Sequence, residues 1–236
     1  MLIPPMTVEI DRVYSQLMAE GQRTLAIVSA NPGEGTTSIA LSLTQRCLLA
    51  GHKTILVDLN LHHPALQASL MLEQPKKSLE LLSSPDLVNT QNHDIAVPGI
   101  TAPSNREHAL KLRKPGVLEH CIEQLKHDYD VIIFDTSAIN RVNASNIPAE
   151  RVAAACDGAL MVVLSGITSE TMVATAIDKL RHGGAQILAC IMNDQFNPPL
   201  KSEILRQIAR LKPRMSKLST WLEKRISKNT FLSLEV

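Results

Sequence analysis

The sequence predicts an α/β fold in which a mostly parallel sheet is flanked by helices. Short apolar runs, rich in Val and Ile, recur along the chain at 25–29, 54–58, 131–135, 159–164 and 187–192. They are nearly continuous rather than alternating, which is typical of parallel strands that are buried on both faces. Helical stretches lie between several of these runs, at 37–50, 116–127 and 170–182. This alternation of strands and helices indicates βαβ units.

Three segments are expected along the chain. They are an N-terminal helix at 1–22, one α/β domain at 23–200 and a basic amphipathic tail at 201–236. One domain is expected because 236 residues with 44% hydrophobic content suffice for a single large core. The stretch 83–105 is polar and carries prolines at positions 85, 98 and 103. We therefore expect mostly loop there, with one short strand at 95–97.

Composition excludes several classes of function. A formal net charge of +1 gives no strong overall field for nucleic acid, and 3% aromatic residues leave few stacking surfaces for single strands. The four cysteines form no CxxC pair, which argues against a zinc site or a disulfide framework and fits a reducing compartment. No apolar run reaches the ~18 residues of a membrane span, and the first residues lack the pattern of a secretory signal. We therefore expect a cytoplasmic protein with no nucleic-acid partner.

A glycine-rich loop follows the first predicted strand and precedes a helix. Residues 30–37 read Ala-Asn-Pro-Gly-Glu-Gly-Thr-Thr, which matches the P-loop pattern except at the lysine, where Thr36 stands instead. Gly33 and Gly35 permit backbone conformations closed to other residues, so successive N–H groups can form a concave nest for an anion. The N-terminus of the following helix adds partial positive charge. A glycine-rich turn alone is common, but its place between strand and helix favours phosphate binding.

Three segments together resemble a known family. Residues 29–38 (Ser-Ala-Asn-Pro-Gly-Glu-Gly-Thr-Thr-Ser) resemble the first Walker motif of the CpsD/CapB-like bacterial tyrosine kinases (BY-kinases), within the wider MinD/ParA group. Residues 55–64 (Ile-Leu-Val-Asp-Leu-Asn-Leu-His-His-Pro) resemble the second Walker motif of that family. Residues 129–136 (Tyr-Asp-Val-Ile-Ile-Phe-Asp-Thr) resemble its Walker B strand. The resemblance implies a P-loop NTPase fold of the MinD/ParA type with a deviant first Walker motif.

The resemblance also implies a ligand and a set of site residues. The implied ligand is ATP or ADP with Mg²⁺. The implied phosphate-binding residues are Gly33, Glu34, Gly35, Thr36, Thr37 and Ser38. Thr37 would ligate Mg²⁺ with Asp58 and Asp135 behind it, and Asn193 would contact the adenine base. The two aspartates could instead cap the turns that follow their strands, but ligands gather at the carboxyl ends of parallel strands, which favours the metal role.

Departures from the family pattern bear on catalysis. Thr36 replaces the lysine that reaches the phosphates, Asn60 replaces the second aspartate of the second Walker motif, and His63 stands where arginine is frequent. The sequence holds two tyrosines, Tyr14 and Tyr129, and so lacks the family's C-terminal tyrosine cluster. One lost hydrogen bond to a charged group costs about 1.5–3 kcal/mol, whereas one preorganised donor contributes roughly 10²–10³ in rate. We therefore expect a pseudokinase-like protein that binds nucleotide and is weak or inactive in phosphoryl transfer.

The tail from 201 to 229 is strongly basic, with nine Lys and Arg against two Glu. One helical stripe is apolar and consists of Ile204, Leu205, Ile208 and Leu211. One interpretation is a pair of surface helices that pack on the sheet and turn their lysines to water. The other is contact with an anionic membrane, with Trp221 at the interface.

The resemblance implies a role in exopolysaccharide or capsule biosynthesis and export, at the cytoplasmic face of the inner membrane. The implied partner is an inner-membrane polysaccharide co-polymerase that regulates chain length. Residues 12–17 (Arg-Val-Tyr-Ser-Gln-Leu) resemble the oligomerisation segment of the family, which implies a homo-oligomer. Asn31 replaces the signature lysine of nucleotide-sandwich dimers, which argues against that particular dimer.

Three alternatives remain open from the sequence. The first is an active ATPase or protein-tyrosine kinase whose target tyrosines lie on a partner chain. The second is a ParA/MinD-like positioning factor of the cellulose-synthesis accessory type, which the basic tail keeps open. A Thr-Thr pair after the second glycine also occurs in ParA-like accessory proteins of bacterial cellulose synthesis, and it favours a regulatory ATP-binding protein. The third is a scaffold that keeps the fold without nucleotide. Nucleotide binding separates the third from the others, and turnover with Mg²⁺ separates an active enzyme from an inactive regulator.

Overall fold

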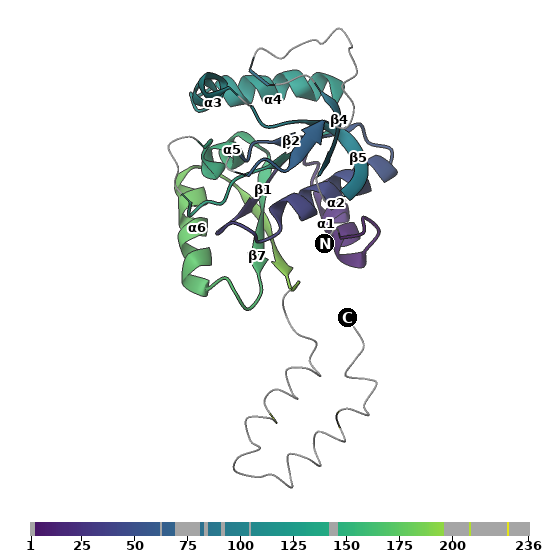
Figure 1. The fold of residues 1–236 in the computed structure, drawn as a ribbon, viewed down its shortest axis with the longest axis vertical. Coiled ribbons are helices and arrows are strands. Elements are labelled where there is room, and N and C mark those ends of the chain that lie inside the picture. The colour runs from purple at the N-terminus through teal and green to yellow at the C-terminus, as the bar shows by residue number, and fades with distance from the viewer. Residues whose placement is uncertain are drawn as a thin grey trace. The chain divides into compact units, whose positions relative to one another are not determined.

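The computed structural model describes residues 3–61, 63–68, 81–82, 85–90, 93–103, 105–141, 146–195, 208 and 226. The chain divides into two compact units, Met1–Asn193 and Asp194–Val236. The first unit contains every helix and strand named below, and Figure 1 shows its sheet between layers of helices. The predicted tail, 201–236, lies outside the described residues except for Ile208 and Ile226, so both interpretations of it stay predictions.

Eight strands form one sheet within the described residues, in the order β3-β4-β5-β2-β6-β1-β7-β8. The predicted apolar runs correspond to β1 (Thr24–Ser29), β2 (Thr54–Asp58), β6 (Val131–Asp135), β7 (Gly158–Leu164) and β8 (Ile187–Asn193). These strands pair in parallel, and every residue of β1, β2, β6 and β7 is buried. The predicted α/β class with a mostly parallel sheet is confirmed.

Two strands lie where the sequence predicts mostly loop. β4 (Asp86–Thr90) and β5 (His93–Ile100) fall within 83–105. β5 pairs in parallel with β2, and β4 pairs antiparallel with β5. A short antiparallel strand, β3 (Leu66–Ala68), completes this edge of the sheet. The short strand expected at 95–97 lies within β5, whereas the expectation of loop for most of 83–105 is wrong.

The reason for this error is the one-sided burial of the edge strands. Val88 of β4 and Val97 of β5 are opposite each other and buried, whereas Leu87 is 40% exposed. A search for continuous apolar runs finds strands buried on both faces and misses such half-polar ones. Pro98 also lies within β5, and proline usually argues against a strand.

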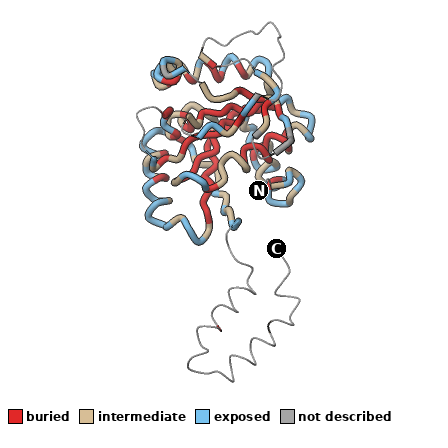
Figure 2. Tube along the Cα trace, viewed as in Figure 1, coloured by how far each residue is buried: buried red, intermediate tan, exposed pale blue. Residues whose placement is uncertain are grey.

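Helices cover both faces of the sheet, and each face has its own core. The first face carries α1 (Val8–Ala19) and α2 (Thr36–Leu49). The opposite face carries α3 (Arg106–Leu112), α4 (Val117–Asp128), α5 (Ala149–Ala155) and α6 (Glu170–His182). Successive side chains of β1 alternate between the two cores, with Leu25 on the α2 face and Ala26 on the other. Figure 2 shows the buried positions concentrated along the strands.

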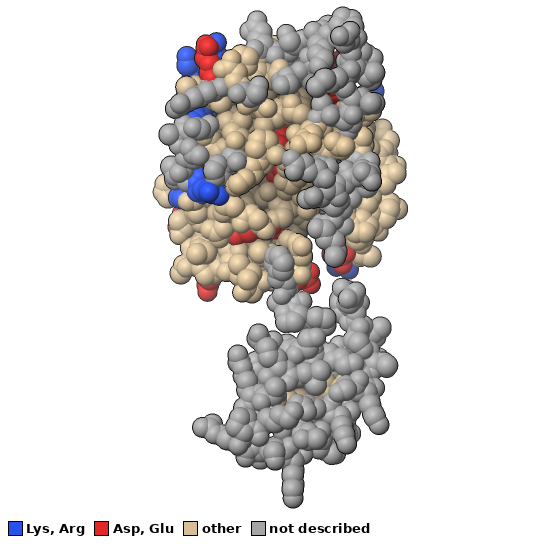
Figure 3. Space-filling model, viewed as in Figure 1, with Lys and Arg blue, Asp and Glu red and all other residues tan. Residues whose placement is uncertain are grey.

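The described surface is mixed in charge. On the face drawn in Figure 3, acidic and basic side chains of the described residues are scattered rather than gathered into one extended patch. Among the described helices, none combines the length and the apolarity that crossing a bilayer would require.

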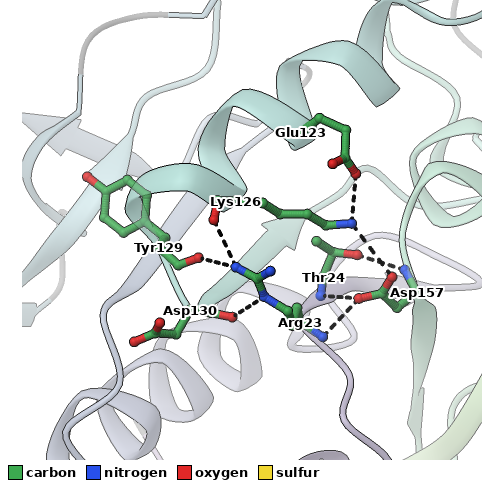
Figure 4. A network of polar contacts seen from close by, with 7 residues as sticks. All are labelled: Arg23, Thr24, Glu123, Lys126, Tyr129, Asp130 and Asp157. Atoms are coloured by element: carbon green, nitrogen blue, oxygen red, sulfur yellow. Dashed lines mark hydrogen bonds and ion pairs between the residues drawn. The ribbon is translucent and has the colours of Figure 1, made fainter.

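A network of polar contacts holds the amino ends of the strands together (Figure 4). The Asp157 carboxylate, just before β7, accepts hydrogen bonds from the backbone N–H groups of Arg23 and Thr24, each at 2.8 Å. The Arg23 guanidinium donates to three carbonyl oxygens at the end of α4, those of Lys126, Tyr129 and Asp130. Helix α4, β1 and β7 are thereby joined at the edge of the sheet opposite the carboxyl ends.

Replacing Asp157 by Asn is expected to lower the free energy of unfolding at pH 7 by about 1–2 kcal/mol, because a charge-assisted acceptor becomes neutral. Burial acts to raise the pKa of Asp157, but the hydrogen bonds from Arg23 and Thr24 outweigh it and the pKa is lowered. Because the pKa is lowered in the folded state, the ionised Asp157 carboxylate stabilises the fold above the unfolded pKa of about 3.9. This stabilisation is lost as the pH falls through the pKa of Asp157 in the folded protein. Urea unfolding at pH 7 and at pH 3 measures this.

The exposed Asp178 of α6 provides the control, since Asp178→Asn removes a carboxylate without such contacts. The difference between wild type and Asp157→Asn should shrink at pH 3, while Asp178→Asn should match wild type at both pH values. A difference of the same size at both pH values would contradict the assigned role of the charge.

Candidate nucleotide-binding site

The glycine-rich loop connects β1 to α2 at the carboxyl edge of the sheet. Gly33 and Gly35 have φ angles of 82° and 99°, in the left-handed region that side chains rarely adopt. Gly35 is the N-cap of α2, whose first residue is Thr36. The loop therefore has the strand–turn–helix setting that its sequence predicts, with the N-terminus of a 14-residue helix behind it.

The Glu34 side chain stabilises this loop through hydrogen bonds. Its side chain is buried, with 2% of the residue exposed. One carboxylate oxygen, Oε2, accepts from the Ala30 backbone N–H at 3.1 Å. The other, Oε1, accepts from Asn31 Nδ2 at 2.9 Å and from Thr168 Oγ1 at 2.6 Å. Any contribution of Glu34 to phosphate binding would therefore come from its backbone, while its side chain fixes the shape of the loop.

Thr37 lies against the Walker B aspartate. Its Oγ1 donates to Asp135 Oδ2 at 2.5 Å, and the Thr36 hydroxyl also forms a hydrogen bond to this carboxylate. Asp135 ends β6 and is fully buried, yet its Oδ1 has no hydrogen-bond partner. A buried carboxylate oxygen without a partner is costly unless a ligand satisfies it. This arrangement leaves one acceptor available beside the Thr37 hydroxyl.

Asp58 and Asp135 stand side by side, because β2 and β6 pair in parallel with these two residues in register. Burial, followed by the neighbouring charge of Asp58, raises the pKa of Asp135 to about 7 despite the hydrogen bonds from Thr37 and Thr36. Burial also raises the pKa of Asp58, against three backbone hydrogen bonds that lower it. Two buried carboxylates that repel each other are a setting in which a divalent cation is stabilising.

Asp58 also caps the turn that follows its strand. Its Oδ1 accepts from the Asn60 N–H at 2.8 Å, and its Oδ2 accepts from the N–H groups of Ala65 and Leu66 at 2.9 and 3.2 Å. The capping role that the sequence left open is therefore present at Asp58. At Asp135 the carboxylate meets side-chain hydroxyls instead, so the two aspartates differ in what they contact.

The residues fit a Mg²⁺ ion. Mg²⁺ prefers oxygen ligands and keeps several waters, with one or two carboxylates and substrate phosphates completing its shell. The available oxygens are those of Thr37, Asp135 and Asp58, the set that the sequence predicts. Within the described part of the chain, no group of three or more His, Cys, Asp and Glu side chains gathers at metal-binding distance. The remaining ligands of such an ion would be water and phosphate.

The turn after β2 holds the two other departures from the family pattern. Asn60 Oδ1 accepts from the His63 backbone N–H at 3.2 Å, so Asn60 closes the turn just as an aspartate would. His63 is exposed and makes a further interaction. The substitution at position 60 thus keeps the local hydrogen bond and removes a negative charge from the neighbourhood of Asp58.

Asn193 reaches the loop from the end of β8. Its Nδ2 donates to the Glu34 carbonyl at 2.9 Å, and a Cβ added at Gly35 would lie 2.6 Å from the same nitrogen. The sequence predicts that Asn193 contacts adenine, and that contact stays a prediction. The structure places the Asn193 amide against the phosphate loop.

Two supporting residues of the loop escaped the sequence analysis. Thr168, in the turn between β7 and α6, holds Glu34. Asn140, after β6, donates its backbone N–H to the Ala30 carbonyl at 3.0 Å. The signal for both was their position, since each is a polar residue that follows the carboxyl end of a strand adjacent to β1. Using this signal requires knowing that β6 and β7 are the neighbours of β1, and the sequence alone does not give the strand order.

Comparison with known proteins identifies relatives of the chain, although no protein-family model matches it. Tyrosine-protein kinase CpsD of Streptococcus agalactiae is 29% identical over 193 residues, which is 77% of this chain and 80% of that protein. Tyrosine-protein kinase YwqD of Bacillus subtilis is 28% identical over 181 residues, which is 72% of each. Succinoglycan biosynthesis transport protein ExoP of Rhizobium meliloti is 25% identical over 186 residues, 75% of this chain but 23% of ExoP.

Solved structures share the fold. The kinase domain of the Escherichia coli tyrosine kinase ETK gives a TM-score of 0.59 at 18% identity, covering 78% of this chain and 71% of that one. MinD of Pyrococcus horikoshii, solved with Mg-ADP, gives 0.52 at 23% identity, covering 75% and 72%. The chain is therefore similar in sequence to the bacterial tyrosine kinases CpsD and YwqD, and it shares its fold with the ETK kinase domain and with MinD.

Proposed function

We propose that the chain binds ATP or ADP with Mg²⁺ at the loop 30–37 and regulates exopolysaccharide or capsule biosynthesis, with weak or no phosphoryl transfer. The observation that carries the nucleotide site is the Thr37 hydroxyl at 2.5 Å from Asp135, whose second oxygen lacks a partner. Backbone N–H groups of the loop would hold the phosphates, and Thr37 with Asp135 and Asp58 would hold Mg²⁺, which supplies charge stabilisation to the phosphates when bound.

The weak-transfer part of the proposal rests on position 36. A lysine there would place a positive charge on the phosphates, whereas the Thr36 hydroxyl is engaged with Asp135. Loss of one charged hydrogen bond costs about 1.5–3 kcal/mol, roughly ten- to hundredfold in affinity. Charge that develops in the transition state depends more strongly on such a donor. Binding is therefore expected to survive a substitution that removes most of the turnover.

The two tyrosines support a regulatory rather than a self-phosphorylating role. Tyr14 in α1 is half-buried, and its hydroxyl is hydrogen-bonded to His52 Nε2 at 3.0 Å. Tyr129 follows α4 at the opposite edge of the sheet from the loop, and burial, then the charge of Asp128, raises its pKa. Neither belongs to a cluster, since the sequence contains two tyrosines in all.

The names of the relatives support a partner in polysaccharide synthesis. CpsD and YwqD are named as tyrosine kinases, and ExoP is named as a transport protein of succinoglycan biosynthesis. We propose that this chain works at the cytoplasmic face of the inner membrane with a polysaccharide co-polymerase that regulates chain length. An active kinase that acts on such a partner is the second candidate, favoured by the oxygens of Thr37, Asp58 and Asp135, which lie together at the carboxyl ends of β2 and β6.

Isothermal titration of ATP, with and without Mg²⁺, tests the nucleotide site on wild type and Gly35→Asp. Wild type is expected to bind in the micromolar to sub-millimolar range, and Gly35→Asp is expected to abolish binding. The introduced side chain would occupy a left-handed position, meet Asn193 and add a negative charge to the loop.

Gly184→Asp is the matched control. Gly184 has a similar φ of 83°, nothing within 4 Å of an added Cβ, and a place beyond α6 remote from the loop. It therefore introduces the same backbone strain and the same charge without touching the site, and should leave ATP binding unchanged. No binding by wild type would mean that the loop keeps its shape without its ligand, and the chain would then be a scaffold.

A further inference from the structure

Glu34 is held by two hydrogen bonds from residues at or after the ends of β8 and β7, one to its backbone carbonyl and one to its side chain. Asn193 Nδ2, at the end of β8, donates to the Glu34 carbonyl at 2.9 Å. Thr168 Oγ1, after β7, donates to the Glu34 carboxylate at 2.6 Å. The two strand ends are themselves joined, because the Ser165 N–H donates to the Asn193 carbonyl at 2.8 Å. Together these hydrogen bonds link Glu34, the residue before Gly35, to the ends of both β7 and β8.

The bond to the Glu34 carbonyl fixes the orientation of the next N–H group. In a trans peptide the C=O and N–H bonds point in opposite directions, and the described part of the chain has no cis peptide bond. With the Glu34 carbonyl directed at Asn193, the Gly35 N–H must point away from Asn193. An N–H group with this fixed orientation is one of those from which a concave anion nest can be built.

Contact with the amide leaves little freedom at this position. A Cβ on Gly35 would come within 2.6 Å of Asn193 Nδ2, closer than any real Cβ contact, so amide and glycine are in direct contact. Gly35 is at once the N-cap of α2 and the residue at φ 99°. A change at Asn193 therefore acts on the peptide that begins the helix.

We propose that Asn193 is a positioning residue of the phosphate loop, which orients the Glu34–Gly35 peptide for triphosphate binding. The role deepens the nucleotide site proposed above and requires that the loop binds phosphate. This positioning role differs from contact with the adenine base in the ligands whose affinity depends on Asn193. A positioning residue affects every ligand that carries the phosphates, whereas a base-reading residue affects only ligands that carry the base.

Binding of Mg-ATP and of Mg²⁺ with inorganic triphosphate separates the two roles. For Asn193→Ala, both affinities are expected to fall by the same factor, about tenfold, as for the loss of one hydrogen bond. Thr168→Val removes the other support of Glu34 and should also weaken both ligands together. The control is Asn105→Ala, which also removes one side-chain hydrogen bond. That bond, from the Glu107 N–H to Asn105 Oδ1, lies at the N-cap of α3 and not in the loop 30–37, so neither affinity should change.

Hydrogen exchange of the peptide that covers 30–39 gives a readout without any ligand. Asn193→Ala should speed exchange there by on the order of tenfold relative to wild type, and Asn105→Ala should leave it unchanged. If ATP affinity falls while triphosphate affinity and loop exchange stay at wild-type values, Asn193 reads the base and the positioning role is wrong. If wild type binds neither ligand, the nucleotide site is wrong, and the exchange rates alone decide whether Asn193 orders the loop.

Discussion

The double substitution Thr36→Lys with Asn60→Asp is expected to raise Mg²⁺-dependent ATP turnover by roughly 10²–10³-fold. Lysine at 36 begins α2, at the place where the P-loop pattern puts its ammonium group on the phosphates. Aspartate at 60 can keep the hydrogen bond to the His63 N–H and restores the negative charge that the family carries beside Asp58. ATP affinity should rise as well, by about ten- to hundredfold. Phosphate release at saturating ATP and titration of ATP measure the two effects.

A variant with glutamine at 36, paired with the same Asn60→Asp, isolates the charge. Glutamine offers a long polar side chain that can donate a hydrogen bond, but it carries no positive charge. Turnover should therefore rise with lysine and stay near the wild-type rate with glutamine. Equal gains from both residues would show that side-chain length rather than charge was missing, and no gain from either would contradict the idea that position 36 limits turnover.

Asp135→Asn is expected to stabilise the metal-free protein and to remove its stabilisation by Mg²⁺ with nucleotide. Burial and the Asp58 charge raise the pKa of Asp135 to about 7. Because its pKa is raised, the Asp135 carboxyl is more easily ionised in the unfolded state than in the folded state. Its contribution to stability is therefore fully present below the unfolded pKa of about 3.9, and it is lost as the pH rises toward 7. The free energy of unfolding of metal-free wild type should thus fall between about pH 4 and pH 7, and this fall should be smaller in Asp135→Asn. At pH 7 the variant should be more stable by at most about 4 kcal/mol, because one unit of pKa corresponds to about 1.4 kcal/mol.

Denaturant unfolding in chelator, followed by the same experiment with Mg²⁺ and ADP, checks both halves of this expectation. Asp130→Asn is the control, because Asp130 is an aspartate at the other end of β6 whose carboxylate accepts from the Lys53 backbone N–H at 2.9 Å. It should lose a little stability in chelator and keep the full response to Mg²⁺ and ADP. A metal-free Asp135→Asn that is less stable than wild type at pH 7, or one that still responds to Mg²⁺, would contradict the assignment.

The sequence was sufficient for the central strands and for the loop, because both leave local patterns. β1, β2 and β6 are continuous apolar runs, and the two glycines at 33 and 35 occur at the spacing that a phosphate loop needs. The edge strands β4 and β5 left no such pattern, since only one of their faces is buried. Their placement depends on the neighbouring strand β2, and a local reading of the chain does not contain that contact.

The candidate site was predictable as a set of residues but not as a set of contacts. Asp58 and Asp135 could be named from their strand ends, yet the capping bonds of Asp58 and the partnerless oxygen of Asp135 depend on the turns around them. Glu34 lies in the glycine-rich loop, but its carboxylate is held by Ala30, Asn31 and Thr168, and the bond to Thr168 depends on a turn 134 positions away. Asn193 donates to the Glu34 carbonyl across 159 positions of the chain, and β8 pairs with β7 through a register shift near Ala159; neither contact can be read from the local sequence.

The contacts around Arg23 and Asp157 have a consequence for how such a protein can change over time. They tie β1, β7 and α4 together at one edge of the sheet, while Thr36 and Asn60 lie at the other. A substitution at position 36 or 60 therefore leaves these contacts at the amino ends of the strands untouched. A protein of this fold that loses a lysine at such a loop is expected to stay folded, so that selection for binding alone can continue to act on it.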